Sequence, residues 1–235
     1  MRDYIVFAKK PSTDFDIFAA DNLTKFSAAQ RRAETIPIPG RNGDLTILDG
    51  SYDNIPIKYK LYVSKDIKSR ILAFRNHLNI NTGYQRLEDT FAPDEYRMAR
   101  FLSLFEVETS DRKNAAFEIE FDCMPQRFLR TGEQVITLTS SSSIHNQNYT
   151  TSRPLVRVYG IGTVTIGGLP IQLTANASYT DIDCETESAY RGSTNLNSSI
   201  VLQNGKFWEL KPGSNSVTLG SGVTRVEITP RYWIL

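Results

Sequence analysis

Four carboxylates occur at every second position in the second half of the chain: Asp181, Asp183, Glu185 and Glu187. In a β-strand this spacing places all four on one face, where paired carboxylates could serve a glycosidase or bind calcium. Four like charges in a row are tolerated where water screens them. The sequence therefore favours a solvated strand face over a reactive site, with the intervening Ile182 and Cys184 pointing inward.

The segment Gly-Arg-Asn-Gly-Asp at residues 40–44 could be read as a phosphate-binding loop. It lacks the Gly-Lys-Ser/Thr ending of such loops, and no predicted helix follows it to supply backbone amides. We therefore expect an Asn-Gly turn, with positive φ at Gly43.

Nucleophiles and metal ligands are sparse. His77 and His145 have no nearby Ser or Cys with a suitable partner, so we expect structural or exposed histidines, although a triad assembled in space stays open. Cys123 falls in an alternating segment typical of a core strand. Cys123 and Cys184 form neither a CxxC motif nor a Cys/His cluster, so we expect no disulfide framework and no zinc site. The sequence predicts no catalytic residue, metal or cofactor.

Two tryptophans, Trp208 and Trp233, could form a platform on which a sugar ring stacks, although such residues more often fill a β-sandwich core. A galectin-type sugar site would require His-x-Asn-Pro-Arg and Trp-x-x-Glu-x-Arg strands. The chain has His-Asn-Gln-Asn at residues 145–148 and Trp-Glu-Leu-Lys at residues 208–211, so neither motif is present. We expect no binding of simple galactosides.

Composition excludes several classes of protein. The 235 residues carry 27 Lys+Arg and 26 Asp+Glu, a formal net charge of +1. This balance argues against a polybasic binder of nucleic acid or membranes. The longest apolar run, residues 4–8, is too short for a membrane span or a signal-peptide core. We expect a reduced protein made inside the cell, with no cleaved leader.

A change of composition near residue 131 predicts two domains. Residues 1–130 hold 20 Lys/Arg and 19 Asp/Glu, whereas residues 131–235 hold 7 of each and are rich in Ser, Thr, Asn and Gly. Such a shift is typical of a domain boundary, which we place within residues 128–134.

The first domain is predicted to be α+β, with one helix on β-sheets. Residues 117–123 alternate between apolar and acidic side chains as a half-buried strand does, and residues 101–108 could pair with them in a hairpin through the polar residues 110–114. A helix over residues 66–79, with Ser64 as N-cap, would carry one apolar stripe that must cover a sheet or a partner. The stripe consists of Ile67, Ile71, Phe74 and Leu78.

The second domain is predicted to be all-β, which makes the chain mainly β. Gly167-Gly168 and Asn204-Gly205 each lie between β-prone segments and predict hairpins, the second joining residues 200–203 to residues 207–210. Residues 212–215 predict a turn. The short strands expected at 217–219 and 223–228 complete a pattern typical of a β-sandwich.

Longer motifs resemble a known family. In the first domain they are Ile-Pro-Gly-Arg-Asn-Gly-Asp-Leu at 38–45, Gly-Ser-Tyr-Asp-Asn-Ile-Pro-Ile at 50–57, Gly-Tyr-Gln-Arg-Leu-Glu-Asp at 83–89, Pro-Asp-Glu-Tyr-Arg at 93–97 and Phe-Asp-Cys-Met-Pro-Gln-Arg-Phe at 121–128. In the second they are residues 154–160, Ile-Asp-Cys-Glu at 182–185, Leu-Lys-Pro-Gly-Ser-Asn at 210–215 and Thr-Pro-Arg-Tyr-Trp at 229–233. In this order they resemble the siphophage distal tail proteins. The residues that carry the resemblance are Pro39, Gly40, Arg41, Gly43, Tyr52, Tyr59, Tyr84, Leu87, Pro93, Tyr96, Pro125, Pro154, Pro212, Gly213, Pro230, Arg231 and Trp233.

The resemblance implies a structural part of the virion at the phage tail tip, made in the bacterial cytoplasm, and not an enzyme. The N-terminal domains of this family close a six-fold ring around the channel that DNA crosses, and galectin-like C-terminal domains point outward to hold baseplate proteins. The implied partners are other copies of the chain in a homo-hexamer, the tail tube protein, a tail-tip hub protein of the tail-associated lysin type and a receptor-binding protein. DNA would be met only in transit, and no membrane partner is implied.

Two other classes of function stay open on the residues alone. One is an adhesin that binds carbohydrate or cell wall through the second domain, which would need exposed aromatics beside a groove. The other is an enzyme that acts on host glycans through the carboxylates of residues 181–187, which would need two of them to converge in a cleft. Residues 131–235 leave no room for the inserted carbohydrate-binding modules that some relatives carry, so we do not expect direct host binding.

Overall fold

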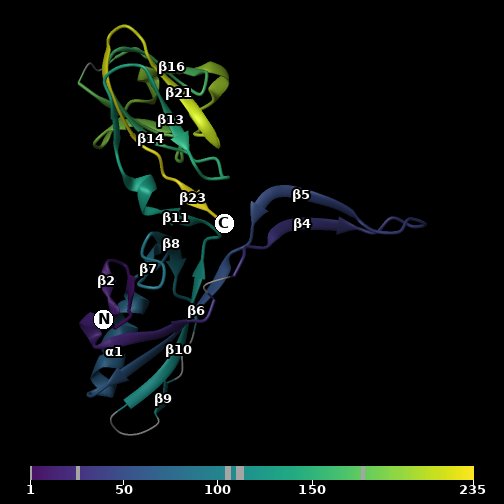
Figure 1. The fold of residues 1–235 in the computed structure, drawn as a ribbon, viewed down its shortest axis with the longest axis vertical. Helices are drawn as coiled ribbons and strands as arrows, with labels where there is room; N and C mark the ends of the chain where they lie inside the picture. The colour runs from purple at the N-terminus through teal and green to yellow at the C-terminus, as the bar shows by residue number, and fades with distance from the viewer. Residues whose placement is uncertain (1, 25–26, 104–106, 110–113, 176–177) are drawn as a thin grey trace. The chain divides into compact units, whose positions relative to one another are not determined.

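The computed structural model describes residues 2–24, 27–103, 107–109, 114–175 and 178–235. The chain divides into two compact units: unit 1 is Met1–Arg127 with Leu235, and unit 2 is Phe128–Ile234 (Figure 1). The described residues contain one α-helix among many antiparallel strands. The predicted mainly β class, with an α+β first part, is confirmed.

Unit 1 is built on an antiparallel sheet with the strand order β2-β1-β7-β8-β10-β6-β3. Its strands are β1 (Ile5–Phe7), β2 (Lys10–Pro11), β3 (Ile17–Asn22), β6 (Ile55–Ser64), β7 (Gln85–Asp89), β8 (Glu95–Arg100) and β10 (Asn114–Cys123). The long pair β6/β10 keeps one register from Asn114↔Ser64 to Cys123↔Ile55. Alternate residues of both strands are buried, as period-two apolar patterning requires.

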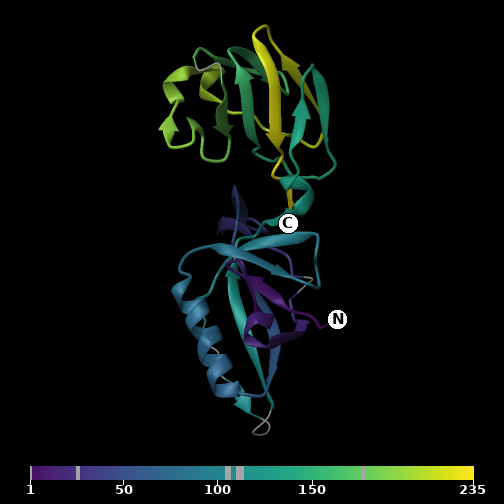
Figure 2. The same ribbon diagram turned by 90° about the vertical axis from the view of Figure 1, so that its left-hand side faces the viewer.

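The helix α1 (Ile67–Ile80) lies against this sheet (Figure 2). Phe74 and Leu78 are buried, and Ile67 and Ile71 pack partly buried against the same core, so the predicted stripe is confirmed. The predicted N-cap is wrong, because Ser64 is the last residue of β6. Lys65 and the actual N-cap Asp66 both have positive φ, which turns the chain sharply from strand to helix. A short 3₁₀ helix, η1 (Ser12–Phe15), places Phe15 on Phe74.

The predicted hairpin before β10 is confirmed, with a shorter first strand. β9 (Val107–Thr109) pairs with β10 in the register Ala115↔Thr109. Residues 101–103 form no strand. The remaining predicted positions, 104–106 and 110–113, lie outside the described residues.

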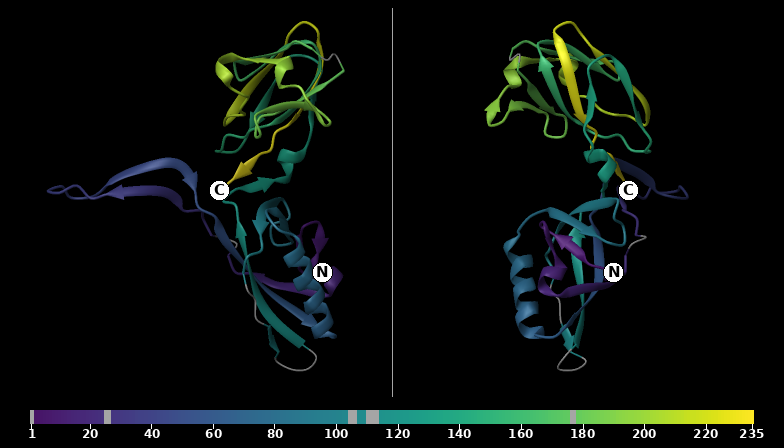
Figure 3. Two further views of the ribbon diagram at one scale, coloured as in Figure 1. Left: turned by 180° about the vertical axis from the view of Figure 1, so that it is seen from behind. Right: turned by 60° about the vertical axis from the view of Figure 1, so that its left-hand side comes forward.

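A two-stranded arm extends away from the sheet of unit 1 (Figures 1 and 3). It consists of β4 (Arg31–Ile36) and β5 (Leu45–Tyr52), joined by residues 37–44. Gly40 and Gly43 in this connection have φ of +79° and +83°. The expected turn with positive φ at Gly43 is therefore present, at the end of a hairpin.

Unit 2 is a sandwich of two antiparallel sheets. The six-stranded sheet has the order β12 (Ile136–Leu138), β22 (Val223–Thr229), β14 (Leu155–Gly160), β17 (Thr180–Asp183), β18 (Ser188–Arg191) and β19 (Thr194–Asn195). The five-stranded sheet has the order β13 (Ser142–Asn146), β21 (Gly213–Leu219), β15 (Gly162–Ile166), β16 (Leu169–Leu173) and β20 (Ile200–Leu202). Outside them lie β11 (Arg127–Leu129), β23 (Trp233–Ile234) and the 3₁₀ helices η2 (Arg130–Glu133), η3 (Asn197–Ser199) and η4 (Gln203–Gly205). Both sheets contribute to one apolar core, which confirms the predicted sandwich.

The turn predictions for unit 2 have mixed outcomes. Gly167-Gly168 closes the hairpin β15/β16, with Ile166 opposite Leu169 and positive φ at both glycines, as predicted. The Asn204-Gly205 hairpin is wrong, because β20 pairs with β16 instead of residues 207–210. The turn at residues 212–215 is also wrong, since β21 already begins at Gly213. The strands expected at 217–219 and 223–228 lie within β21 and β22.

Candidate interaction sites

The arm β4/β5 lies outside any core. Every residue from 30 to 50 is exposed. Cross-strand partners share a face, so the register Ile36↔Leu45 and Glu34↔Ile47 assigns these four side chains to one face of the ribbon. Ala33, Leu48, Thr35 and Thr46 make up the opposite face.

The first of these faces is mostly apolar. Ile36, Leu45 and Ile47 leave 39%, 44% and 48% of their surface exposed. A lone two-stranded ribbon is marginally stable in water. Contiguous exposed apolar side chains mark interaction sites. The face of Glu34, Ile36, Leu45 and Ile47 is therefore a candidate contact surface, which we call the arm face.

Polar contacts fix the base of the arm. Arg32 Nε donates to Asp53 Oδ1 at 2.7 Å, and the Arg31 guanidinium lies 5.2 Å from the centre of the Tyr52 ring. The register shifts by two residues here, and Asp49 Oδ1 accepts hydrogen bonds from the backbone N and Oγ of Ser51. These two bonds lower the pKa of Asp49. A bulge held in this way sets the direction in which a ribbon leaves its sheet.

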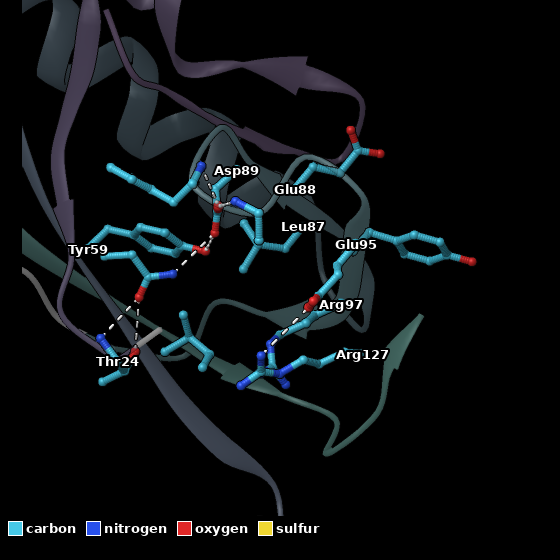
Figure 4. A pocket seen from close by; sticks show the side chains of 13 residues that line it. Thr24, Tyr59, Leu87, Glu88, Asp89, Glu95, Arg97 and Arg127 are labelled. Atoms are coloured by element: carbon cyan, nitrogen blue, oxygen red, sulfur yellow. Dashed lines mark hydrogen bonds and ion pairs between the residues drawn. The ribbon is translucent and has the colours of Figure 1, made fainter. Parts of the chain in front are cut away.

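A polar cluster lies at the end of β7 in unit 1 (Figure 4). Tyr59 Oη and Asn22 Nδ2 donate to Asp89 Oδ2 at 2.5 and 3.2 Å, and the backbone N–H groups of Phe91 and Ala92 donate to Asp89 Oδ1 at 2.9 Å each. Burial, then the charge of Asp89, raises the pKa of Tyr59 well above its usual value. The carboxylate thus ties β3, β6 and β7 together.

The carboxylates of unit 2 require a correction. Asp181 and Asp183 were expected on a solvated face, but they are only 5% and 7% exposed. Arg157 makes a two-pronged ion pair with Asp181, Nε to Oδ1 at 2.6 Å and Nη2 to Oδ2 at 2.9 Å. Arg231 pairs with Asp183 in the same way, at 2.6 and 2.8 Å. Such pairs compensate for the loss of water around a buried carboxylate.

Burial alone would raise the pKa of Asp183. The hydrogen bonds and charge of Arg231, together with the backbone N–H groups of Thr186 and Glu185, lower it by more, so the pKa of Asp183 lies below its usual value. β17 ends at Asp183, so Glu185 and Glu187 lie beyond the strand and are exposed. The four carboxylates therefore do not form one ladder. Ile182 and Cys184 are buried as predicted.

Three of the remaining candidates for chemistry, Trp208, Trp233 and His77, make structural contacts. Trp208 is fully buried and its indole N–H donates to Leu169 O at 2.9 Å, so it is a core residue as the commoner interpretation predicted. Trp233 is partly buried and donates to Thr151 O. His77 Nε2 lies 2.9 Å from Phe7 O, and His145 is exposed on β13. The two tryptophans do not offer the exposed ring pair that an adhesin would need.

Both cysteines are buried, and burial raises the pKa of each thiol to about 12. Within the described residues, His, Cys, Asp and Glu form no group of three or more that could hold a metal ion. None of the helices found there has the length and apolar character needed to cross a membrane.

The residues that carry the resemblance fall into three places. Pro39, Gly40, Arg41, Gly43 and Tyr52 belong to the arm or its base.

In the rest of unit 1, Tyr59, Leu87 and Tyr96 line the pocket beside Asp89, and Tyr84 Oη accepts from Asn54 Nδ2 at 2.6 Å. Pro93 is exposed and Pro125 partly buried.

In unit 2, Pro154 and Pro230 are buried, Pro212 is exposed, and Gly213 begins β21 with φ of +88°. Trp233 is the first residue of β23, and Arg231 forms an ion pair with Asp183.

Sequence reasoning missed the arm face and both polar clusters. The arginine partners of Asp181 and Asp183 lie 24 and 48 positions away. The Asp89 cluster joins residues 22, 59 and 89. Such pairs become visible only when the strand register is known. The one local signal for them in the sequence was the alternation of charged and apolar residues along the predicted strands.

Unit 1 combines an antiparallel sheet covered by one helix with an arm inserted in the chain between β3 and β6, and unit 2 is a β-sandwich. This combination is the fold of a siphophage distal tail protein. One of the solved structures that match is the crystal structure of the SPP1 Dit (gp 19.1) protein, with a TM-score of 0.76 and 14% sequence identity over 100% of both chains. That protein is described as a paradigm of the hub adsorption apparatus in phages that infect Gram-positive bacteria. The resemblance first drawn from sequence motifs is thus confirmed at the level of the fold. No protein-family model and no curated protein matches this chain.

Proposed function

We propose that this chain is a structural hub subunit of a phage tail tip, in which six copies close a ring that joins the tail tube to the host-adsorption apparatus and lets DNA pass. The observation that carries the proposal is the full-length fold match to a hub protein of phage adsorption. The other partners are the tail tube protein, a tail-tip hub protein and a receptor-binding protein. The chain acts in the virion, at the tail tip.

The arm face supports assembly from copies of this chain. Burial of its apolar side chains against a neighbour would contribute favourable free energy to association, and the contact would order a hairpin that lies outside the core. A ring needs head-to-tail contacts, in which one surface of a subunit meets a different surface of the next. We assign the arm face to one side of that contact, with a second copy of the chain as the occupant.

The charge balance favours the same occupant. Residues 1–130 carry 20 Lys/Arg and 19 Asp/Glu, so identical subunits can present complementary charges without net repulsion. Near neutrality also suits a conduit, because a strongly basic lumen would retain passing DNA.

Electron microscopy of the purified full chain tests the proposal. Class averages with six-fold symmetry and a central opening are the expected result. Particles of single-subunit size at every concentration, with the arm intact and the protein folded, would contradict it.

A further inference from the structure

A small polar cavity in unit 1 has a charged group that no contact explains. The cavity measures about 50 Å³ and lies against β6, β7 and β8. Tyr59 and Asp89 line one side, and Glu95, Arg97 and Arg127 line the other (Figure 4). One water needs at least about 10–15 Å³ of such space, so the cavity holds roughly three to five waters or one small anion.

Arg97 is the unexplained group. It lies on β8, and its Nη1 is buried with no hydrogen-bond partner among the described residues. Burial, followed by the charge of Arg127, lowers the pKa of Arg97. A buried cationic donor without an acceptor is costly, so this nitrogen is a strong site for an incoming anion.

The neighbouring charges do not supply that acceptor. The Arg127 guanidinium lies beside that of Arg97 (Figure 4). Arg127 Nη2 donates to Ser27 O at 3.1 Å, and Arg127 Nη1 lies 3.7 Å from Glu95 Oε2. The carboxylate across the cavity, Asp89, accepts two hydrogen bonds on each of its oxygens. An anion placed between the two guanidiniums would satisfy Arg97 and relieve the repulsion between like charges.

We propose that this cavity binds a single carboxylate group, held by Arg97 with Arg127 beside it. A planar carboxylate matches the planar guanidinium fork. Glu88, Asp89 and Glu95 also line the cavity. Glu88 is paired with Arg86 outside it, so the two guanidiniums face two further carboxylates, and a doubly charged phosphate meets repulsion that a monoanion meets less. The small volume admits the end of an acidic side chain or a small free acid, which share this chemistry. The inference is independent of the proposed ring.

The experiment measures the melting temperature of the full chain in sodium formate against sodium chloride of equal ionic strength. Formate at ten times its dissociation constant adds about 1.4 kcal/mol and is expected to raise the melting temperature by roughly 3–6 °C in a saturable manner. Arg97→Met should abolish the rise while melting at or above the wild-type temperature in chloride, since it removes an unpaired buried charge. Arg75→Met, at an exposed position on α1, is the matched control and should keep the rise.

Two further probes distinguish the source of the carboxylate. N-acetyl-glutamate amide carries an acidic side chain on a peptide-like body, and N-acetyl-glutamine amide is its neutral counterpart. A response to formate and to the glutamate probe indicates a partner's acidic side chain, whereas a response to formate alone indicates a small free acid. Arg97→Lys keeps the positive charge but lacks the planar guanidinium, so it should retain a weaker response to formate. This variant replaces Arg97→Met in the test if Arg97→Met does not fold. Equal effects of formate and chloride, an undiminished rise in Arg97→Met, or stronger binding of phosphate would overturn the proposal.

Discussion

Replacement of Ile47 by aspartate is expected to disrupt assembly without harming the fold. Complete burial of an isoleucine contributes about 1.5–3 kcal/mol. Since 48% of Ile47 is exposed, its burial under a neighbour would add about 1 kcal/mol. An aspartate loses this contribution and must also give up its water shell, which costs several kcal/mol per ion. The sum is at least about 3 kcal/mol per contact, a weakening of roughly 100-fold or more.

Sedimentation velocity over a concentration series measures this change, with thermal unfolding as the check on folding. Thr46→Asp is the matched control, because it adds the same charge at the neighbouring exposed position on the opposite face of the ribbon. Both variants should melt within about 2 °C of the wild type, since exposed substitutions change stability by about 0.5 kcal/mol or less. Only Ile47→Asp should shift the assembly to small species. Unchanged assembly of Ile47→Asp, or equal loss in Thr46→Asp, would refute the assignment of the arm face.

Four other results are expected. Both cysteine thiols should resist iodoacetamide at pH 8 in the native protein and react after denaturation, because burial holds their pKa at about 12; rapid native labelling followed by mass spectrometry would contradict this. Asp181→Asn should destabilise unit 2 by about 2 kcal/mol in urea unfolding, whereas Glu185→Gln should change it by less than about 0.5 kcal/mol. The folded pKa of Asp183 lies below its ordinary value of 3.8, so its pairing with Arg231 stabilises unit 2 fully above that pH and is lost as the pH falls below it; Arg231→Met should flatten this part of the pH profile of melting. Lactose should give no saturable binding in calorimetry, since both galectin-type sugar motifs are missing; binding at millimolar affinity or better would favour an adhesin.

Features that depend on neighbours in sequence could be predicted. The stripe of α1 follows from the spacing of Ile67, Ile71, Phe74 and Leu78, and its burial needs only a sheet beside it. Gly167-Gly168 closes a hairpin because a two-residue turn with positive φ fits the strand twist.

Features that depend on distant strands could not. The Asn204-Gly205 hairpin failed because β20 pairs with β16, about thirty residues earlier, and local turn chemistry does not encode that choice. Asp181 was assigned to solvent because its partner Arg157 becomes its neighbour only through the register of β14 and β17. The sequence pattern assigns no location to the apolar residues of β5, and only the structure shows that they lie on an arm outside the core.

The mass of the full chain in solution, measured by light scattering across a concentration series, tests the central claim most directly. A closed ring predicts a plateau at six times the 26.6 kDa of the chain, with no growth beyond it, because closed head-to-tail contacts leave no free end. A mass of 26.6 kDa that persists to the highest concentration of folded protein, or a mass that rises without a plateau, would contradict the hexameric hub.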